Sequence, residues 1–294
     1  VTSDALRYGR GRLSCEFGSL ADGFATFSGA GTFDSNTTRR WGLLTPTDAG
    51  YLMQGLFQMG TVTNPVDFRD SNVSIIIPNT KRVISTFNLI EIRNATSRVD
   101  WTTVNITALG TTSRGDFTVV DNADVNIESC SFTSMGTFTL LAATAITNST
   151  LRSCDTITAP GSDLRGTSVL TSIVAADAGA VIWNVSTNPD GLLDNMTFSK
   201  GTNAHHAIDF GTAVTASITL RGCAFTGFGS TADANDSTVR FLATTGSLTL
   251  SLVGCTVNGV AASTSNFSVD DAAGISVSLS IDPVTVTVTT KDAS

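Results

Sequence analysis

The chain has 294 residues, 41% of them hydrophobic, which is enough for one large domain with a substantial core. Its formal net charge is −8 and only 14% of its residues are charged. An acidic chain without a basic stripe is not expected to bind nucleic acid. No run of about 18 apolar residues occurs, so no membrane partner is expected either.

The surface composition favours strands and turns over helices. The chain contains three lysines and three glutamates, the residues that usually cover helices. Ser, Thr, Asn and Gly take their place, as is typical of β-strands and the turns between them.

Residues 1–62 differ from the rest of the chain and are predicted to form an N-terminal attachment and capping segment. They begin with a stretch rich in Gly and Phe. One short helix is predicted over residues 46–58, because Thr45 can act as its N-cap and an apolar face runs from Leu52 to Phe57. A helix at this place would cover the exposed end of the fold that follows.

The densest positive and aromatic stretch of the chain also lies in this segment. It consists of Arg39, Arg40 and Trp41. Arginine and tryptophan are favoured anchors in protein interfaces. The alternative is a helix start with solvated arginines. We predict that these three residues form an interface with neighbouring subunits.

From about Val73 onward the sequence pattern is typical of β-strands. Short apolar segments such as "SIIIP", "VISTFNLIEI" and "DFTVV" are rich in β-branched residues and are separated by Gly, Asn, Asp and Ser. Such a series fits a sandwich, a barrel or a solenoid, and an internal repeat distinguishes between them.

Four segments share one pattern: "VNIESCSFTSMG", "LLDNMTFSKG", "ITLRGCAFTGFG" and "LSLVGCTVNG". An apolar residue is followed by Cys or Met three positions later, and by Phe or Val two positions after that, as in Ile127, Cys130 and Phe132. On a straight strand, positions i and i+3 face opposite sides, so both face inward only if the chain turns a corner between them. Each segment is therefore predicted as strand, exposed corner, strand.

A corner that recurs every 24 to 32 residues predicts a right-handed parallel β-helix over residues 63–272, in an all-β protein. Each coil would place one residue in an internal core ladder, made of Cys130, Cys154, Met196, Cys223 and Cys255. The 42-residue interval between Cys154 and Met196 is expected to hold one coil with a long insertion. The five cysteines are expected to be free buried thiols.

The last segment, residues 273–294, alternates apolar and polar residues strictly. It is predicted to form C-terminal β capping strands, or strands that pair with another copy of the chain.

Longer stretches resemble a family of virion structural proteins encoded by tailed phages and viral metagenomes. They include "RRWGLLTPTDAGYLMQGLFQMGTVTNPVDFRDSN", "FNLIEIRNATSRVDW", "ALGTTSRGDFTVVDNADVNIESCSF" and "GTNAHHAIDFG". The resemblance covers roughly residues 30–290. It implies a β-helical virion component, located on the surface of an extracellular particle.

Three aspartates are the best candidates for catalysis. β-Helix enzymes that cleave polysaccharides use two or three carboxylates on one outer face. Asp190, Asp194 and Asp209 form such a candidate cluster close to the expected insertion, with Asp163 and Asp177 one coil earlier. Many aspartates in turns produce such clusters by chance, and few aromatic residues are available to stack on sugars.

The only two histidines, His205 and His206, are adjacent. Neighbouring residues on a strand point to opposite faces, so one histidine is expected inside and the other outside. A general base oriented by Asp209 is one interpretation, and a turn residue beside a satisfied interior histidine is the other. No metal-ligand pattern and no cofactor motif is recognisable, so neither a metal nor a cofactor is expected.

Two functions follow from these patterns. The first is a non-catalytic virion protein, a decoration, fibre or tail-associated homotrimer that contacts other virion proteins through residues 1–62. The second is a tailspike-type depolymerase that uses Asp190, Asp194 and Asp209 on a host-surface glycan. The uncharged Ser, Thr and Asn surface favours the first.

Overall fold

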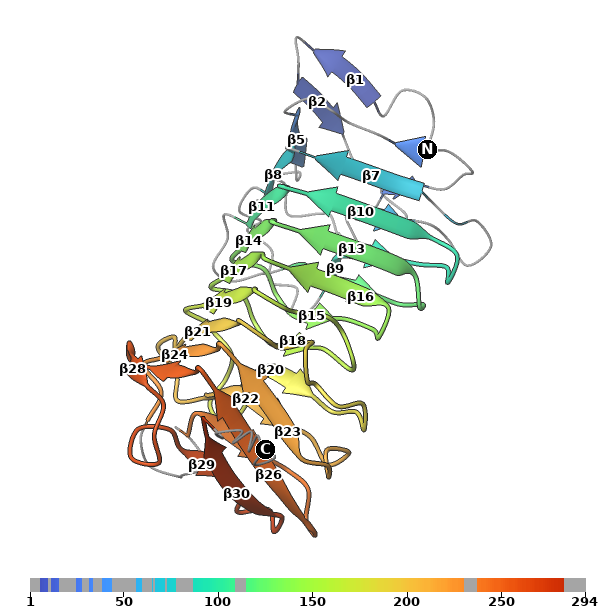
Figure 1. Cartoon of the computed structure of the whole chain (residues 1–294). Helices are drawn as coiled ribbons and strands as arrows, with labels where there is room; N and C mark the ends of the chain where they lie inside the picture. Colours follow the sequence, from blue (N-terminus) through green and yellow to red (C-terminus); the bar gives the residue numbers. More distant parts are fainter. Residues whose placement is uncertain are drawn as a thin grey trace, which may run out of the picture.

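The computed structural model describes residues 90–107, 115–229 and 237–282 with their side chains. Elsewhere it describes mainly strands between residues 6 and 89, by their backbone. Every regular element of the described residues is a β-strand, and the strands stack into parallel sheets (Figure 1). The prediction of an all-β fold with stacked parallel strands is therefore confirmed.

Twelve strands form sheet A. In spatial order they are β1 (Leu6–Gly9), β2 (Arg12–Cys15), β5 (Arg39–Leu43), β8 (Val73–Ile77), β11 (Asn105–Ala108), β14 (Ser131–Thr133), β17 (Thr150–Arg152), β19 (Ser168–Leu170), β21 (Thr197–Ser199), β24 (Ala224–Thr226), β27 (Thr256–Val257) and β28 (Val260–Ala261). Only the two pairs at its ends, β1 with β2 and β27 with β28, are antiparallel.

Ten strands form sheet B. In spatial order they are β29 (Val269–Asp270), β25 (Val239–Phe241), β22 (His206–Phe210), β20 (Gly179–Trp183), β18 (Ile157–Thr158), β15 (Phe138–Thr139), β12 (Gly115–Val119), β9 (Phe87–Ile92), β6 (Phe57–Met59) and β3 (Ala25–Phe27).

Two shorter sheets complete the described part. Sheet C contains β16 (Thr144–Thr147), β13 (Asp124–Glu128), β10 (Arg98–Thr102), β7 (Asp67–Ser71) and β4 (Thr32–Phe33). Sheet D contains β23 (Ile218–Arg221), β26 (Ser247–Val253) and β30 (Ser276–Ile281).

The chain visits these sheets in a fixed order. It passes through β10 in sheet C, β11 in sheet A and β12 in sheet B, and then returns to β13, which pairs in parallel with β10. We call one such passage a coil. Later coils continue to pass through sheets A and B in turn, without a strand on the third face between β18 and β19 or between β20 and β21, and with sheet D on that face from β23 onward. Their strands lie one after another along the length of the molecule in Figure 1.

A single residue in the left-handed region makes each corner between sheet C or D and sheet A. At the corner between β13 and β14, Ser129 has φ of 54°, and Asn148, Asn195, Gly222 and Gly254 serve the later coils. This residue interrupts the alternation of the strand. Ile127 and Cys130 are consequently both buried although they are three positions apart, while Glu128 is exposed.

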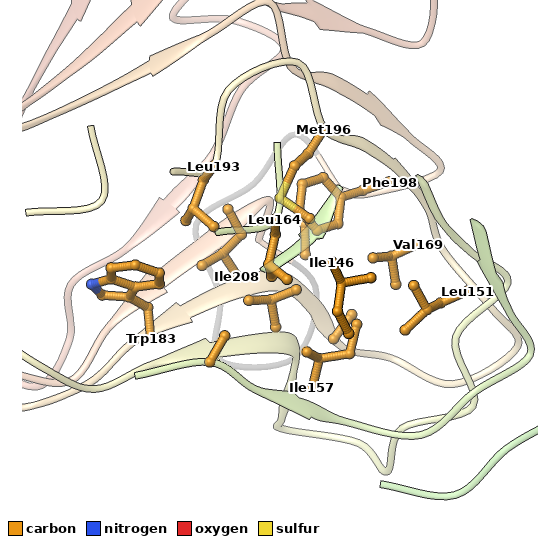
Figure 2. Close-up of a cluster of buried hydrophobic side chains, with 14 of the residues drawn as sticks. Ile146, Leu151, Ile157, Leu164, Val169, Trp183, Leu193, Met196, Phe198 and Ile208 are labelled. Atoms are coloured by element: carbon orange, nitrogen blue, oxygen red, sulfur yellow. The ribbon is translucent and has the colours of Figure 1, made fainter. Parts of the chain in front are cut away.

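The inward side chains of the three faces fill one continuous interior. In Figure 2, Ile146, Leu151 and Ile157, which come from three successive strands of one coil, point into the same space. Stacked neighbours keep their register, so Phe198 lies on Phe225 with ring centroids 5.3 Å apart and almost parallel planes. A core of this kind grows by one layer with each coil.

Several boundaries differ from those expected. Strands β2 to β6 join the sheets of the later coils, so the stack of sheets extends across residue 62. Residues 46–56 of the expected helix lie outside the described residues, and its last residues, from Phe57, belong to strand β6. Strand β30 pairs in parallel with β26 and extends sheet D, whereas residues 283–294 lie outside the described part.

Candidate functional site

The corner position, which we define as the residue directly before each strand of sheet A, contains most of the core ladder. It is buried in every coil from β11 onward and contains Val104, Cys130, Ser149, Thr167, Met196, Cys223 and Cys255. Cys154 lies elsewhere, two residues after β17 at the next corner of its coil. The chain therefore completes three coils between Cys130 and Met196, whereas the expected ladder through Cys154 implied two.

Several side chains at the corner position also pair with backbone carbonyls, which the sequence pattern did not reveal. The thiol of Cys130 lies 3.7 Å from the carbonyl of Trp101, and the thiol of Cys223 lies 3.2 Å from that of Leu193, in each case on the preceding coil. Thr167 donates in the same way to Ile146 O at 2.6 Å. Thiols and hydroxyls occupy this position because they pair with carbonyls in a dry interior.

The structure does not bring the three candidate aspartates together. Asp209 lies on β22 in sheet B, whereas Asp190 and Asp194 lie between β20 and β21, where their segment hydrogen-bonds to β23 of sheet D through Asn195 N and Arg221 O. One oxygen of Asp190 accepts a hydrogen bond from Thr219 N at 2.6 Å.

Asp194 lies beside the ion pair of Asp163 and Arg165, whose closest atoms are 2.6 Å apart. The hydrogen bond with Asp163 and, less strongly, the charge of Asp194 raise the pKa of Arg165. One oxygen of Asp194 is buried without a hydrogen-bond partner among the described residues. Among Asp190, Asp194 and Asp209, only Asp194 has a buried oxygen without a hydrogen-bond partner among the described residues.

Asp209 is buried and paired. Its carboxylate contacts the guanidinium of Arg240 at 2.6 Å and accepts a hydrogen bond from Gly179 N at 2.7 Å. Arg240 also donates to the carbonyl of Asp177, which ties three segments together. A carboxylate held in this way connects adjacent coils, and removal of its partner would leave a buried charge uncompensated.

Both histidines are completely buried, which differs from the expectation of one inside and one outside. The alternation rule fails because His205 precedes strand β22 and lies in the corner, where its ring meets Phe228 edge to face. Nδ1 of His205 lies 2.7 Å from Asn203 O, and Nδ1 of His206 lies 2.9 Å from Ser237 O. The ion-pair partner of Asp209 is Arg240.

Sequence reasoning missed a carboxylate pair formed by Asp116, on β12 of sheet B, and Asp155, in the connection before β18. Asp116 accepts a hydrogen bond from Thr137 N at 2.7 Å, and its pKa is raised mainly by burial and also by the charge of Asp155. Perturbed carboxylates of this kind are candidates for function. The sequence spacing contained a signal for this pair. Asp116 comes one residue before Phe117 and Asp155 two residues before Ile157, and both of these apolar residues stack on Phe138 of β15.

The predicted interface residues Arg39, Arg40 and Trp41 belong to strand β5, which pairs in parallel with β2 and β8. Their side chains lie outside the described part of the chain. In the parts of the chain that the structure describes, no group of three or more His, Cys, Asp or Glu side chains is arranged to hold a metal ion. The same parts contain no helix of the length and apolarity needed to cross a membrane.

Comparison of the chain with protein-family models, with curated proteins and with solved structures finds no match.

Proposed function

We propose that the chain is a non-catalytic structural protein of a virion, built as a right-handed parallel β-helix and exposed on the particle surface as a decoration, fibre or tail-associated protein. The observation that carries the proposal is the stack of coils around one apolar interior. Such a stack gives a long, stiff molecule whose length grows with the number of coils. The resemblance of the longer sequence stretches to virion proteins of tailed phages supports the same function.

The outer surface of sheet A supports assembly of several copies, and we propose a homotrimer. On each strand the residues flanking the buried one point outward, and from β11 to β27 they are Asn105, Thr107, Ser131, Thr133, Thr150, Arg152, Ser168, Leu170, Thr197, Ser199, Ala224, Thr226 and Thr256. None of them is acidic, although the chain carries 25 acidic residues. Copies that meet through this surface avoid bringing carboxylates together.

Attachment to other virion proteins is assigned to residues 1–62, with Arg39, Arg40 and Trp41 at the contact. Variants with Arg39 and Arg40 both replaced by Ser should still form the trimer but should no longer incorporate into particles. If the double variant incorporates as well as the unchanged chain, the attachment proposal is wrong.

The depolymerase function receives less support from the geometry. Asp209 is bound to Arg240 and lies on sheet B, whereas Asp190 and Asp194 lie in turns between β20 and β21. The test is release of reducing sugar from host-surface polysaccharide by the purified chain. We expect none. Release that disappears in Asp194→Asn, or in Asp116→Asn, would overturn the non-catalytic proposal and identify the carboxylates responsible.

The trimer is tested separately by light scattering coupled to size-exclusion chromatography. We expect about three times the chain mass of 30.5 kDa. A matched pair of substitutions distinguishes the surfaces: Thr197→Glu adds charge to sheet A, and Thr158→Glu adds the same charge to sheet B. The first should dissociate the trimer and the second should leave it intact.

A further inference from the structure

Cys223 and Cys255 occupy the corner position on consecutive coils, and no other described cysteine has a cysteine neighbour there. The strands that follow them pair in register, Ala224 opposite Thr256, and Thr256 N donates to Cys223 O at 2.9 Å. Adjacent strands lie about 4.8 Å apart, which falls within the range of Cα separations that a disulfide spans.

The two thiols also influence each other's protonation. They share a hydrogen bond, which raises the pKa of the Cys223 thiol and lowers the pKa of the Cys255 thiol. Cys255 Sγ lies 3.3 Å from Leu220 O, on the coil of Cys223, so this sulfur atom is directed toward the coil of its partner. Cys223 Sγ lies 3.2 Å from Leu193 O, on the coil before.

We propose that Cys223 and Cys255 form an oxidisable pair, which a peroxide converts into a disulfide that joins the two coils. In the first step the Cys255 thiolate attacks one oxygen of the peroxide. The O–O bond breaks, Cys255 becomes a sulfenic acid, and hydroxide or alkoxide leaves. In the second step the sulfur of Cys223 attacks Sγ of Cys255. The S–O bond breaks, and water leaves with the proton from the Cys223 thiol.

The remaining buried cysteines provide an internal control. Cys130 lies in the same corner position, but its neighbours are Val104 on one side and Ser149 on the other, and Ser149 Oγ accepts a hydrogen bond from Cys130 N. Burial raises the pKa of the Cys130 thiol to about 11, so little thiolate forms at neutral pH. Cys154 lies at a different corner. Neither should form a disulfide with another described cysteine.

The consequence of oxidation is a covalent connection within the last coils of the described chain. It would close a loop between residues 223 and 255 and limit the freedom of the unfolded chain in this region. Disulfides persist in oxidising surroundings and not in a reducing cytosol, so the pair would change state when the protein leaves the cell.

The experiment exposes the native full chain to dilute hydrogen peroxide, blocks the remaining thiols in denaturant and digests with trypsin. The cysteines fall in different tryptic peptides, 222–240 and 241–291. We expect these two peptides to appear linked, about 2 Da lighter than their sum as free thiols, and to separate after reduction. Peptides containing Cys130 and Cys154 should remain unlinked.

The matched variants are Cys223→Ala and Cys130→Ala. Cys223→Ala should leave Cys255 as a sulfenic or sulfinic acid, whereas Cys130→Ala should form the 223–255 link as the unchanged chain does. If either variant does not fold, the presence or absence of the 223–255 link in the unchanged chain tests the proposal. Recovery of both cysteines as free thiols under conditions that oxidise a model dithiol, or a link to any other cysteine, would overturn the proposal.

Discussion

Asn148 and Gly166 occupy the same corner on consecutive coils, and the side-chain oxygen of Asn148 lies directly over Gly166. A Cβ added to Gly166 would come within 2.2 Å of that oxygen. Asn195 and Gly222 repeat the relationship, again at 2.2 Å. Asparagine tolerates the left-handed region and glycine adopts it freely, so the two residues alternate where successive corners must stack closely.

Gly166→Ala should therefore destabilise the chain by about 2 to 4 kcal/mol, because it adds a steric contact to the strain of φ at 69°. The control is Gly254→Ala, which also has positive φ, at 62°, but no neighbour within 4 Å of the added Cβ. It should cost only about 1 kcal/mol. Urea unfolding followed by circular dichroism measures both, and equal losses would show that the Asn148 contact has no effect.

Breaking the buried ion pair of Asp209 and Arg240 should destabilise the chain strongly. Arg240→Met leaves the carboxylate of Asp209, which is 3% exposed, without its cationic partner. Loss of one member of a buried pair costs about 3 to 5 kcal/mol. In the control, Arg98→Met removes an exposed pair with Asp100 and should cost less than about 1 kcal/mol. Similar midpoints of chemical unfolding for the two variants would contradict this assignment.

Stability should decrease on mild acidification because of His205. Burial is the main cause that lowers its pKa below 6.5 in the folded chain, and Lys200 and His206 lower it further, against the opposing effects of Asn203 and Asp209. As the pH falls, His205 therefore binds a proton at a higher pH in the unfolded chain than in the folded chain. The free energy of unfolding should be constant above about pH 7.5. It should fall below pH 6.5, by at most about 1.4 kcal/mol per pH unit.

The matched variant is His205→Gln, which cannot take up this proton. Its stability should be lower overall but should depend less on pH between 5 and 6.5. The same slope in the variant and in the unchanged chain would assign the effect to other groups.

Removal of a stacked ring should test the continuity of the core. Phe225 stacks on Phe198 and meets Phe267 edge to face, with centroids 5.4 Å apart. Phe225→Ala should lower the free energy of unfolding by about 3 to 5 kcal/mol, and Phe225→Leu by a smaller amount. Because each coil contacts only its neighbours, amide exchange should increase most in β21, β24 and β27. A uniform increase along the whole stack would contradict this view of the fold.

The repeat in the sequence predicted the corner well. Ile127, Cys130 and Phe132 are all buried, as their spacing required. The pattern failed between Cys130 and Met196, because Ser149 and Thr167 occupy the corner position of two short coils. Their hydroxyl groups are satisfied by carbonyls, so a search for hydrophobic residues passes over them.

The candidate site was less predictable for a related reason. Sequence proximity suggested that Asp194 and Asp209 would face one surface, but a coil divides its residues among separate sheets. The partner of Asp209 is Arg240, 31 residues further along and on the next coil. Such partners depend on the length of each coil, which the sequence pattern did not define at every turn.

The most direct test of the central proposal is a cryo-electron microscopy reconstruction of particles that carry this chain. We predict three copies on the particle surface, each a right-handed β-helix, with the outer surfaces of sheet A facing one another and residues 1–62 at the particle. Absence of the chain from purified particles, or a chain whose Cys130, Met196 and Cys223 do not lie along one axis, would contradict it.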